Sequence, residues 1–275
     1  MNNILIIARK EIQEGLRNRW VLAVTLLLAS LALTLSFLGS TPTGNVVAGR
    51  LDIVIVSLAS LTIFLIPLIA LLLAHDAIVG EMERGTLLLL LSYPIGRRQI
   101  VLGKFVGHTL ILSVATLVGY GAAGAALIAA GTPVSASSWI SFACMIGSSI
   151  LLGAVFMALG YLVSASVSQR STAGGIALGI WLFFVIIYDM GLLGALVSTK
   201  GQGFSPGLLS ALLMANPTDA YRLLNLGSEA AGSVSAMSGV AAGSLLTPQL
   251  LVASLLLWAA VPLSLAIARF SRREL

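Results

Sequence analysis

Residues that could do chemistry are few in this chain of 275 residues, and they are scattered. The string Gly203-Phe204-Ser205-Pro206-Gly207 has the G-x-S-x-G spacing of a hydrolase nucleophile. Such a nucleophile needs a preceding strand and a histidine base. No strand pattern precedes it, and His75 and His108 fall in distant segments. Ser205 before proline is instead typical of a helix N-cap with proline at the first helical position.

Metal and redox chemistry find little support in the residue spacing. The single cysteine, Cys144, excludes an internal disulfide and a multi-cysteine metal site. His75 and His108 could approach each other, and Cys144 shares an apolar segment with Met145 and Met157. Metal ligands converge at defined spacings, whereas methionines in apolar helices usually pack. We interpret both sets as structural and expect no metal site and no cofactor bound by this chain.

Nucleotide hydrolysis by this chain is also not expected. The string closest to a P-loop is Gly96–Lys104, but its glycines are too far apart and Phe105 follows the lysine. The chain is therefore predicted to be non-catalytic, with any ATP and Mg²⁺ bound by a separate polypeptide.

The elements that position these residues are predicted to be membrane helices. Hydrophobic residues make up 58% of the chain and charged residues 9%, against about 25% charged in soluble domains. A helix needs about 20 apolar residues to cross a bilayer. The segments that meet this requirement are Trp20–Leu38, Ile53–Ala74, Phe105–Ala130, Trp139–Ser164, Gly174–Val197 and Leu250–Ala268.

The distribution of basic residues predicts the orientation. Twelve Lys and Arg residues lie in the N-terminal segment, the loops after spans two and four, and the tail, and the other side has Arg50, Lys200 and Arg222. The positive-inside rule then places both termini in the cytoplasm, as an even number of spans requires. The net charge of +5 accordingly indicates basic cytoplasmic loops rather than binding of nucleic acid.

The whole chain, residues 1–275, is predicted to be one transmembrane domain. Residues 1–19 have an amphipathic pattern, with Leu5, Ala8, Ile12 and Leu16 on the apolar side. This pattern favours a helix in the membrane interface, and a solvated extension of span one is the alternative. The remaining parts are spans one and two (20–74), a cytoplasmic hairpin (75–104), spans three to five (105–197), an outer helical loop (198–249), span six (250–268) and a cytoplasmic tail (269–275).

The hairpin combines a charge cluster with a run of five leucines, residues 87–91. Tyr93-Pro94 should end its helix, because proline cannot continue one and restrains the residue before it. Gly96-Arg97-Arg98 should then begin the approach to span three. A leucine run beside charges is difficult to shield without lipid or another protein. Two interpretations follow: a plain solvated hairpin, or a docking element for a cytoplasmic partner.

The outer loop contains two helix-start patterns. Ser205-Pro206 predicts a short helix over Leu208–Met214, and Asn216-Pro217-Thr218-Asp219 predicts a second helix with Asp219 in its first turn. Tyr221, Leu223 and Leu224 give the second helix an apolar side. The two helices would form either a rigid outer platform or a cap on the bundle.

Span five carries an intramembrane carboxylate, Asp189. A carboxylate inside a span costs about 2.5–3.5 kcal/mol, so it should face the bundle interior or water. A buried hydrogen-bonded anchor and a functional polar site both remain possible. The same span has Gly175 and Gly179 in G-x-x-x-G spacing, which permits close helix approach and makes them candidates for a dimer face.

The inner motifs resemble the hallmark of one family. Asp76–Leu87, Tyr93–Arg98 and Gly103–Phe105 are similar to the cytoplasmic segment of ABC-2-type transporter permeases. Within that family, the chain resembles permeases of nitrous oxide reductase maturation. The resembling stretches are Ile7–Glu11, Gly15–Trp20, Ser57–Leu91 and Asn216–Leu223.

The resemblance implies an all-α membrane fold of the ABC-2 (type V) permease class, with six transmembrane helices and an amphipathic N-terminal helix. It also implies a homodimer in the bacterial inner membrane with two copies of a cytoplasmic ABC ATPase and a periplasmic β-helix protein. ATP-driven movement would be transmitted to that protein and support copper-site assembly. The alternatives are an ABC exporter of a sulfur species or other small solute, and an ATP-independent channel or membrane enzyme.

The resemblance also implies roles for individual residues. Those implied in ATPase docking and coupling are Asp76, Gly80, Glu81, Glu83, Arg84, Gly85, Thr86, Pro94, Arg97 and Arg98. Those implied in docking the periplasmic partner are Asn216, Pro217, Asp219, Tyr221 and Arg222.

Overall fold

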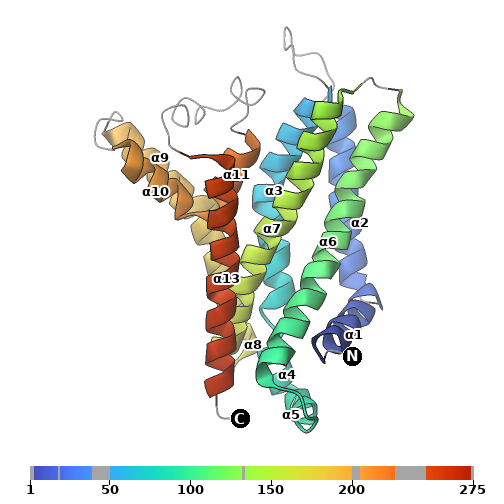
Figure 1. Ribbon diagram of the computed structural model, residues 1–275, viewed down its shortest axis with the longest axis vertical. Helices are drawn as coiled ribbons and strands as arrows, with labels where there is room; N and C mark the ends of the chain where they lie inside the picture. Colours follow the sequence, from blue (N-terminus) through green and yellow to red (C-terminus); the bar gives the residue numbers. More distant parts are fainter. Residues whose placement is uncertain are drawn as a thin grey trace.

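The computed structural model describes residues 3–17, 19–38, 50–131, 134–199, 205–226 and 246–273. Every regular element in these ranges is helical, and the long helices run along one axis of the molecule (Figure 1). The elements are α1 (Asn3–Arg17), α2 (Arg19–Leu38), α3 (Arg50–Ala74), α4 (Val79–Glu83), α5 (Thr86–Leu91), α6 (Arg97–Ala129), α7 (Ala136–Ser166), α8 (Arg170–Leu182), the π-helical turn η1 (Phe183–Ile187), α9 (Tyr188–Ser198), α10 (Pro206–Met214), α11 (Pro217–Leu226) and α13 (Pro248–Arg272).

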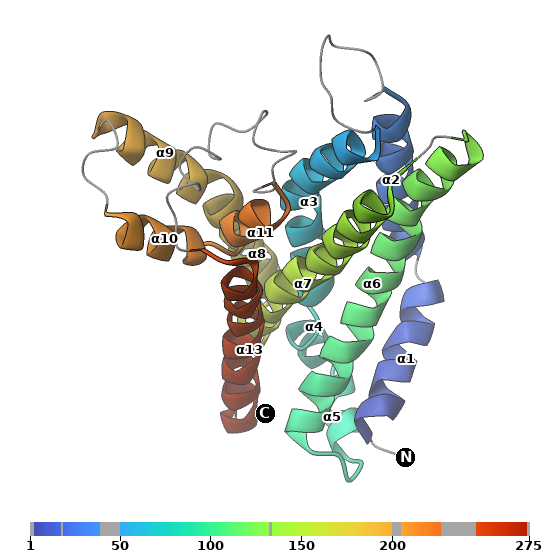
Figure 2. The same cartoon turned by 45° about the horizontal axis from the view of Figure 1, so that its top comes forward.

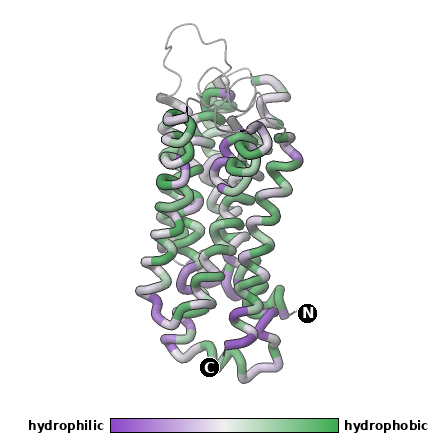
Figure 3. The backbone as a smooth tube through the Cα atoms, turned by 90° about the vertical axis from the view of Figure 1, so that its left-hand side faces the viewer, coloured by the Kyte–Doolittle hydropathy of each residue, from purple (hydrophilic) through white to green (hydrophobic). Residues whose placement is uncertain are grey.

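The described part holds five helical segments that are long and apolar enough to cross a membrane, so the chain is a multi-pass membrane protein. They are Leu51–Glu83, Arg97–Ala129, Ala136–Ser166, Arg170–Ser198 and Pro248–Arg272, which correspond to the predicted spans two to six. In α2, the predicted first span, the apolar stretch Val21–Ser36 is shorter than the others. Figure 3 shows hydrophilic segments gathered towards the end that holds both termini, with apolar segments along the middle.

The core is built around α7, which packs along α3 and α13, while α6 packs along α1 and α2. In its most apolar stretch, 67% of α7 is buried, compared with 17% of the segment Arg170–Ser198. The hydrophobic core is therefore concentrated on α3, α6 and α7. The segment that contains Asp189 keeps much of its apolar surface exposed.

At the inner end, the hairpin differs from the prediction and the start of the next helix agrees with it. The hairpin helix is split into α4 and α5, because Gly85 has a φ of 70° and reverses the chain between them. Helix α6 begins at Arg97 with Gly96 as its N-cap, as predicted from Gly96-Arg97-Arg98, so Lys104 lies inside the helix that continues into span three.

The face of α1 that packs on α6 differs from its predicted apolar side. The helix buries Ile7, Ala8 and Glu11 against α6, whereas Leu5 is 60% exposed. The contact face is therefore turned from the one that hydropathy alone suggests, and it includes a carboxylate.

Span five and the outer loop are more irregular than expected. The span has a π-helical turn between α8 and α9, and α9 and α10 extend to one side of the bundle (Figure 2). The two helices predicted in the outer loop are present as α10 and α11. Ser205 caps α10 by accepting a hydrogen bond from Leu208 N at 3.2 Å.

Candidate functional site

A buried ionic cluster lies at the end of the molecule that holds both termini. Lys104 Nζ on α6 is 2.8 Å from Glu11 Oε1 on α1 and 2.7 Å from Glu81 Oε1 on α4. His108 Nε2 lies 3.2 Å from Glu11 Oε2, and the hydroxyl of Tyr161 on α7 lies 2.8 Å from His108 Nδ1. We call these five residues the inner cluster. It joins the N-terminal helix to the predicted coupling hairpin.

Close packing of α1 on α6 places Glu11 in this cluster. A Cβ on Gly103 would lie 2.7 Å from Ile7 Cβ, and a Cβ on Gly107 would lie 2.7 Å from Glu11 Cβ. Only glycine permits this approach, because a real Cβ at that distance would force one helix away. The G-x-x-x-G spacing of Gly103 and Gly107 thus brings a carboxylate of one helix onto an ammonium of the other.

The inner cluster has more carboxylate than its cation can satisfy. Burial opposes the charge of Glu11, but the hydrogen bond to His108 and the charge of Lys104 outweigh it and lower the pKa of Glu11 to about 2. Glu81 has one oxygen on Lys104, and its other oxygen, Oε2, is buried without a hydrogen-bond partner among the described residues. A buried polar atom without a partner costs free energy, so it weakens the attachment of α4 to the inner cluster.

The hairpin is also fastened to the spans beside it. Ser164 Oγ on α7 accepts hydrogen bonds from Ile78 N at 3.0 Å and Val79 N at 3.1 Å, at the start of α4. Arg170 at the start of α8 pairs with Asp76 at 3.0 Å, and its backbone N donates to Glu83 Oε1 at 2.7 Å. Movement of α4 would therefore be felt directly by α7 and α8.

The remaining residues implied in ATPase docking lie around this cluster. The guanidinium of Arg84 lies over Gly80, where a Cβ would be 3.4 Å from Nη2. Thr86 Oγ1 donates to Glu81 O at 3.3 Å. Arg97 donates to the carbonyls of Phe270, Ser271 and Arg273 at the end of α13. Gly85 forms the turn between α4 and α5, while Pro94 and Arg98 are exposed.

A second ionic cluster lies where α9 meets α11. Arg222 binds Asp189 with both guanidinium nitrogens, Nη1–Oδ1 at 2.8 Å and Nη2–Oδ2 at 2.9 Å, and its Nη1 is 3.0 Å from Asp219 Oδ1. Asn216 Nδ2 donates to Asp219 Oδ2 at 2.9 Å. We call these four residues the outer cluster. Asp189 therefore serves as an anchor for α11 in the structure.

The outer motif is largely internal to the chain. Asn216 and Asp219 are fully buried, as is Tyr221, whose hydroxyl lies 2.9 Å from Ser149 Oγ on α7. Burial raises the pKa of Asp219 to about 6 in spite of the neighbouring Arg222, and burial raises the pKa of Tyr221 to about 12. Any effect of these buried residues on a partner must pass through the position of α11.

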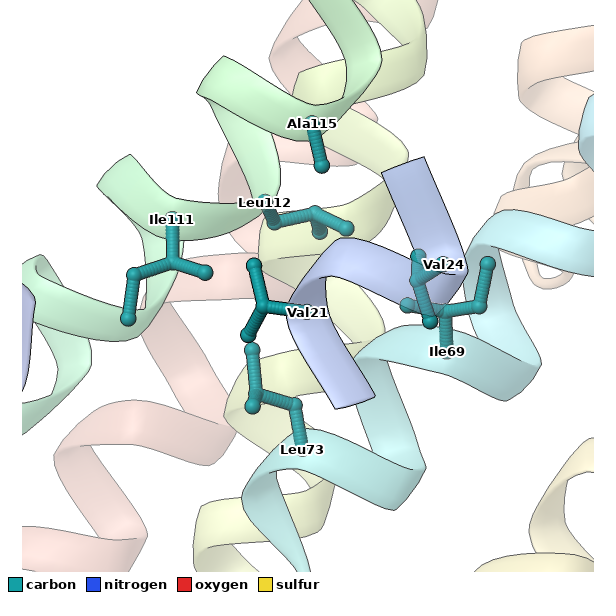
Figure 4. A pocket seen from close by; sticks show the side chains of 7 residues that line it. All are labelled: Val21, Val24, Ile69, Leu73, Ile111, Leu112 and Ala115. Carbon is teal, nitrogen blue, oxygen red and sulfur yellow. The ribbon is translucent and has the colours of Figure 1, made fainter. Parts of the chain in front are cut away.

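The described residues do not assemble the hydrolase or metal sites that were considered from the sequence. His108 belongs to the inner cluster, whereas His75 Nδ1 lies 3.0 Å from Leu72 O in its own helix. No group of His, Cys, Asp and Glu that could hold a metal ion occurs in the described part. A pocket between α2, α3 and α6 is walled by aliphatic side chains (Figure 4), so it offers no hydrogen bond to a polar solute. Its lining is Val21, Val24, Ile69, Leu73, Ile111, Leu112 and Ala115.

Comparison with known proteins identifies the family to which the chain belongs. The family model described as "ABC-2 family transporter protein" matches residues 5–275. The chain belongs to the ABC-2 family of transporter permeases. It is 49% identical to the probable ABC transporter permease protein NosY of Stutzerimonas stutzeri, over 276 residues that cover 99% of each chain. It is 48% identical to the protein of the same name from Pseudomonas aeruginosa, over 270 residues and 98% of each chain.

Several residues of this ABC-2 permease's inner cluster, and of the contacts that fasten the hairpin to α7 and α8, were not found from the sequence. They are Glu11, His108, Tyr161, Ser164 and Arg170. The spacing of Gly103 and Gly107 was a usable signal for Glu11, since it marks the face of α6 that a helix can approach. The hydroxyls of Tyr161 and Ser164 carry no such mark, because polar residues of this size are common inside membrane helices.

Proposed function

We propose that this ABC-2 permease couples ATP hydrolysis by a separate cytoplasmic ABC ATPase to a periplasmic β-helix partner. In this way it would support copper-site assembly of nitrous oxide reductase, as its likeness to NosY suggests. The proposal includes six spans in the bacterial inner membrane, both termini in the cytoplasm, and two copies each of permease and ATPase. The permease would be mechanical and non-catalytic.

The observation that carries this proposal is the bonding of α7 at two levels, near its inner end at Ser164 and near its middle at Ser149. Ser164 on α7 accepts two backbone N–H groups at the start of α4. Ser149, about 22 Å away at about 1.5 Å per residue, bonds Tyr221 of α11. One well-buried helix thus links the hairpin implied in ATPase docking to the outer helices implied in partner docking. A displacement of α7 at Ser164 would reach Ser149 at nearly its full size, because close-packed helices compress little.

The first experiment is a mild-detergent pull-down of the tagged chain from its native membranes, with mass spectrometry of the recovered proteins. An ATPase together with a periplasmic β-helix protein supports the coupling proposal. An ATPase without a periplasmic partner would favour an exporter of a sulfur species or other small solute. Recovery of neither from a folded sample would contradict the proposal.

A second experiment separates docking from transmission. We expect Glu81→Gln, Glu83→Gln and Arg84→Gln to leave the fold intact and to uncouple ATP hydrolysis from maturation of the periplasmic enzyme. Glu14→Gln is the matched control, because Glu14 is 62% exposed and its one ion pair among the described residues is with Lys10 at 3.3 Å. ATPase rate and copper content of the mature enzyme are measured together. Full maturation in all three hairpin variants would refute the docking role.

A further inference from the structure

The π-helical turn in span five exchanges one backbone hydrogen bond for another. In an α-helix, Tyr188 N would donate to the carbonyl four residues earlier, which is that of Phe184. Here Tyr188 N donates instead to Phe183 O, five residues earlier. The turn thereby gives up the α-helical bond to Phe184 O, a carbonyl that lies deep in an apolar segment, where an unmade bond is costly.

Two side chains at the start of α11 take the place of that bond. Asn216 Nδ2 donates to Phe184 O at 3.0 Å, and Thr218 Oγ1 donates to it at 3.1 Å. Asn216 is fully buried and Thr218 nearly so. Asn216 Oδ1 also accepts from Thr218 N at 3.0 Å, which caps α11 and fixes the amide in this orientation. The carbonyl released by the π turn is therefore the one that the outer helix binds.

The turn is packed by two neighbouring helices, whereas α9 beyond it keeps most of its apolar surface exposed. The ring of Phe184 is packed edge-on by Phe156 of α7, at 6.1 Å between centroids, and by Trp258 of α13, at 5.4 Å. Beyond the turn, Leu192 is the buried residue of α9, while Met190 is 69% and Val197 77% exposed. Packing therefore holds the turn in place, whereas α9 is held mainly by polar contacts, which include the hydrogen bond from the Tyr188 hydroxyl to Leu212 O of α10 at 2.7 Å and must break before α9 can rotate.

We propose that the start of α11 is a register latch, which holds span five in its π-helical form and releases α9 to rotate when Asn216 and Thr218 leave Phe184 O. On release, Tyr188 N would bond Phe184 O and the span would become a continuous α-helix. Each residue of α9 would then turn by about 100° and advance about 1.5 Å. Asp189 would take the direction that Met190 has now and lose its pairing with Arg222.

The Asp189–Arg222 pair is the second part of the latch. Its bidentate geometry holds only in the π register, because a turn of about 100° carries the carboxylate away from α11. An unpaired carboxylate facing lipid is costly, so the pair opposes release. The latch stands on this geometry alone and does not depend on the ATPase coupling proposed above.

Spin labels on both sides of the turn test the latch in the full chain, reconstituted in lipid nanodiscs. Leu178→Cys and Val197→Cys supply the labels in a Cys144→Ser background, since both positions are more than half exposed. In the π register the two labels lie on about the same face of the span, whereas in the α register they are about 100° apart. For labels about 10 Å from the helix axis, release lengthens their separation by about 5 Å.

The test variant carries Asp189→Asn, Asn216→Ser and Thr218→Val. Serine retains an N-cap acceptor for α11, and valine retains the β-branched shape of threonine. The control variant carries Asp189→Asn and Ser149→Ala, which removes a buried hydrogen bond of α11 to α7 but leaves both donors on Phe184 O. The expected result is the longer distance in the test variant and the original distance in the control.

Two results would overturn the latch. One is an unchanged distance in a folded test variant, and the other is an equal increase in the control, which would mean general loosening of α11. If the test variant fails to fold, Asp189→Asn with Thr218→Val takes its place, since it keeps the Asn216 cap. A second population at the longer distance must then appear beside the first, and a single unchanged population would refute the latch.

Discussion

The inner and outer clusters are built on the same plan and differ in the cation. In each, two carboxylates of different helices meet one basic side chain. The inner cation is Lys104, a compact ammonium that touches one oxygen each of Glu11 and Glu81. The outer cation is Arg222, whose planar group binds both oxygens of Asp189 and one of Asp219.

The difference concerns how tightly each cluster fixes its helices. A guanidinium bound at both nitrogens sets distance and orientation together, whereas an ammonium sets distance and permits rotation. Asp219 has both oxygens bonded, to Arg222 and Asn216, while Glu81 has one buried oxygen without a partner among the described residues. The inner arrangement suits a joint that must shift, and the outer arrangement suits one that must hold its geometry.

The largest expected effect comes from removing the inner cation. Lys104→Met leaves Glu11 and Glu81 buried without a counter-charge, which should lower the free energy of unfolding by about 3–5 kcal/mol. Lys10→Met is the control, because Lys10 is 47% exposed and lies 3.9 Å from Glu11, farther than Lys104, so its loss should cost less than about 1 kcal/mol. Thermal unfolding in detergent measures both. Adding Glu11→Gln and Glu81→Gln to Lys104→Met should restore stability, and equal losses in the two single variants would contradict the buried-charge argument.

At the outer cluster, a change in the shape of the cation without a change of its charge should be enough to destabilise the fold. Arg222→Lys keeps the positive charge and loses the bidentate contact to Asp189, so we expect a loss of about 1–3 kcal/mol. Arg98→Lys, at an exposed position, should be close to neutral. Unfolding in denaturant compares them. If lysine is tolerated at residue 222, the outer joint is held by charge alone and the contrast with the inner cluster disappears.

The two clusters should also respond to pH in opposite directions. Asp219 has its pKa raised to about 6 in the fold, so the fold gains stability relative to Asp219→Asn as pH falls from 7 to 5, by about 1 kcal/mol. Glu11 has its pKa lowered to about 2, so its contribution is complete above pH 4.5 and is lost as pH falls from there. Unfolding temperatures of wild type, Asp219→Asn and Glu11→Gln at pH 7 and 5 should show that only the Asp219 difference changes strongly.

The sequence predicted the elements better than their contacts. The spans followed from continuous apolar runs, and the caps at Ser205 and Asn216 followed from residue types that accept helix N–H groups. The π turn left no mark, because one extra residue in a wide turn does not change mean hydropathy. The same G-x-x-x-G spacing occurs at Gly103–Gly107, which packs on α1, and at Gly175–Gly179, where an added Cβ would meet nothing within 4 Å. Spacing shows that a face can be approached, but not what approaches it.

The smallest expected effect is near the middle of α7, where it contacts α11. Ser149→Ala removes one hydrogen bond to Tyr221, while Ser148 still bonds Asn225 at 3.0 Å, so the loss should be about 1 kcal/mol or less. At the inner end, Ser164→Ala leaves the backbone N–H groups of Ile78 and Val79 without their shared acceptor and should cost about twice as much. Hydrogen exchange at α4 and α11 measures each loss locally. Equal protection losses would mean that the bonds of Ser149 and Ser164 are equally replaceable, and a larger loss at α4 would mean that the inner contact of α7 depends on a single hydroxyl.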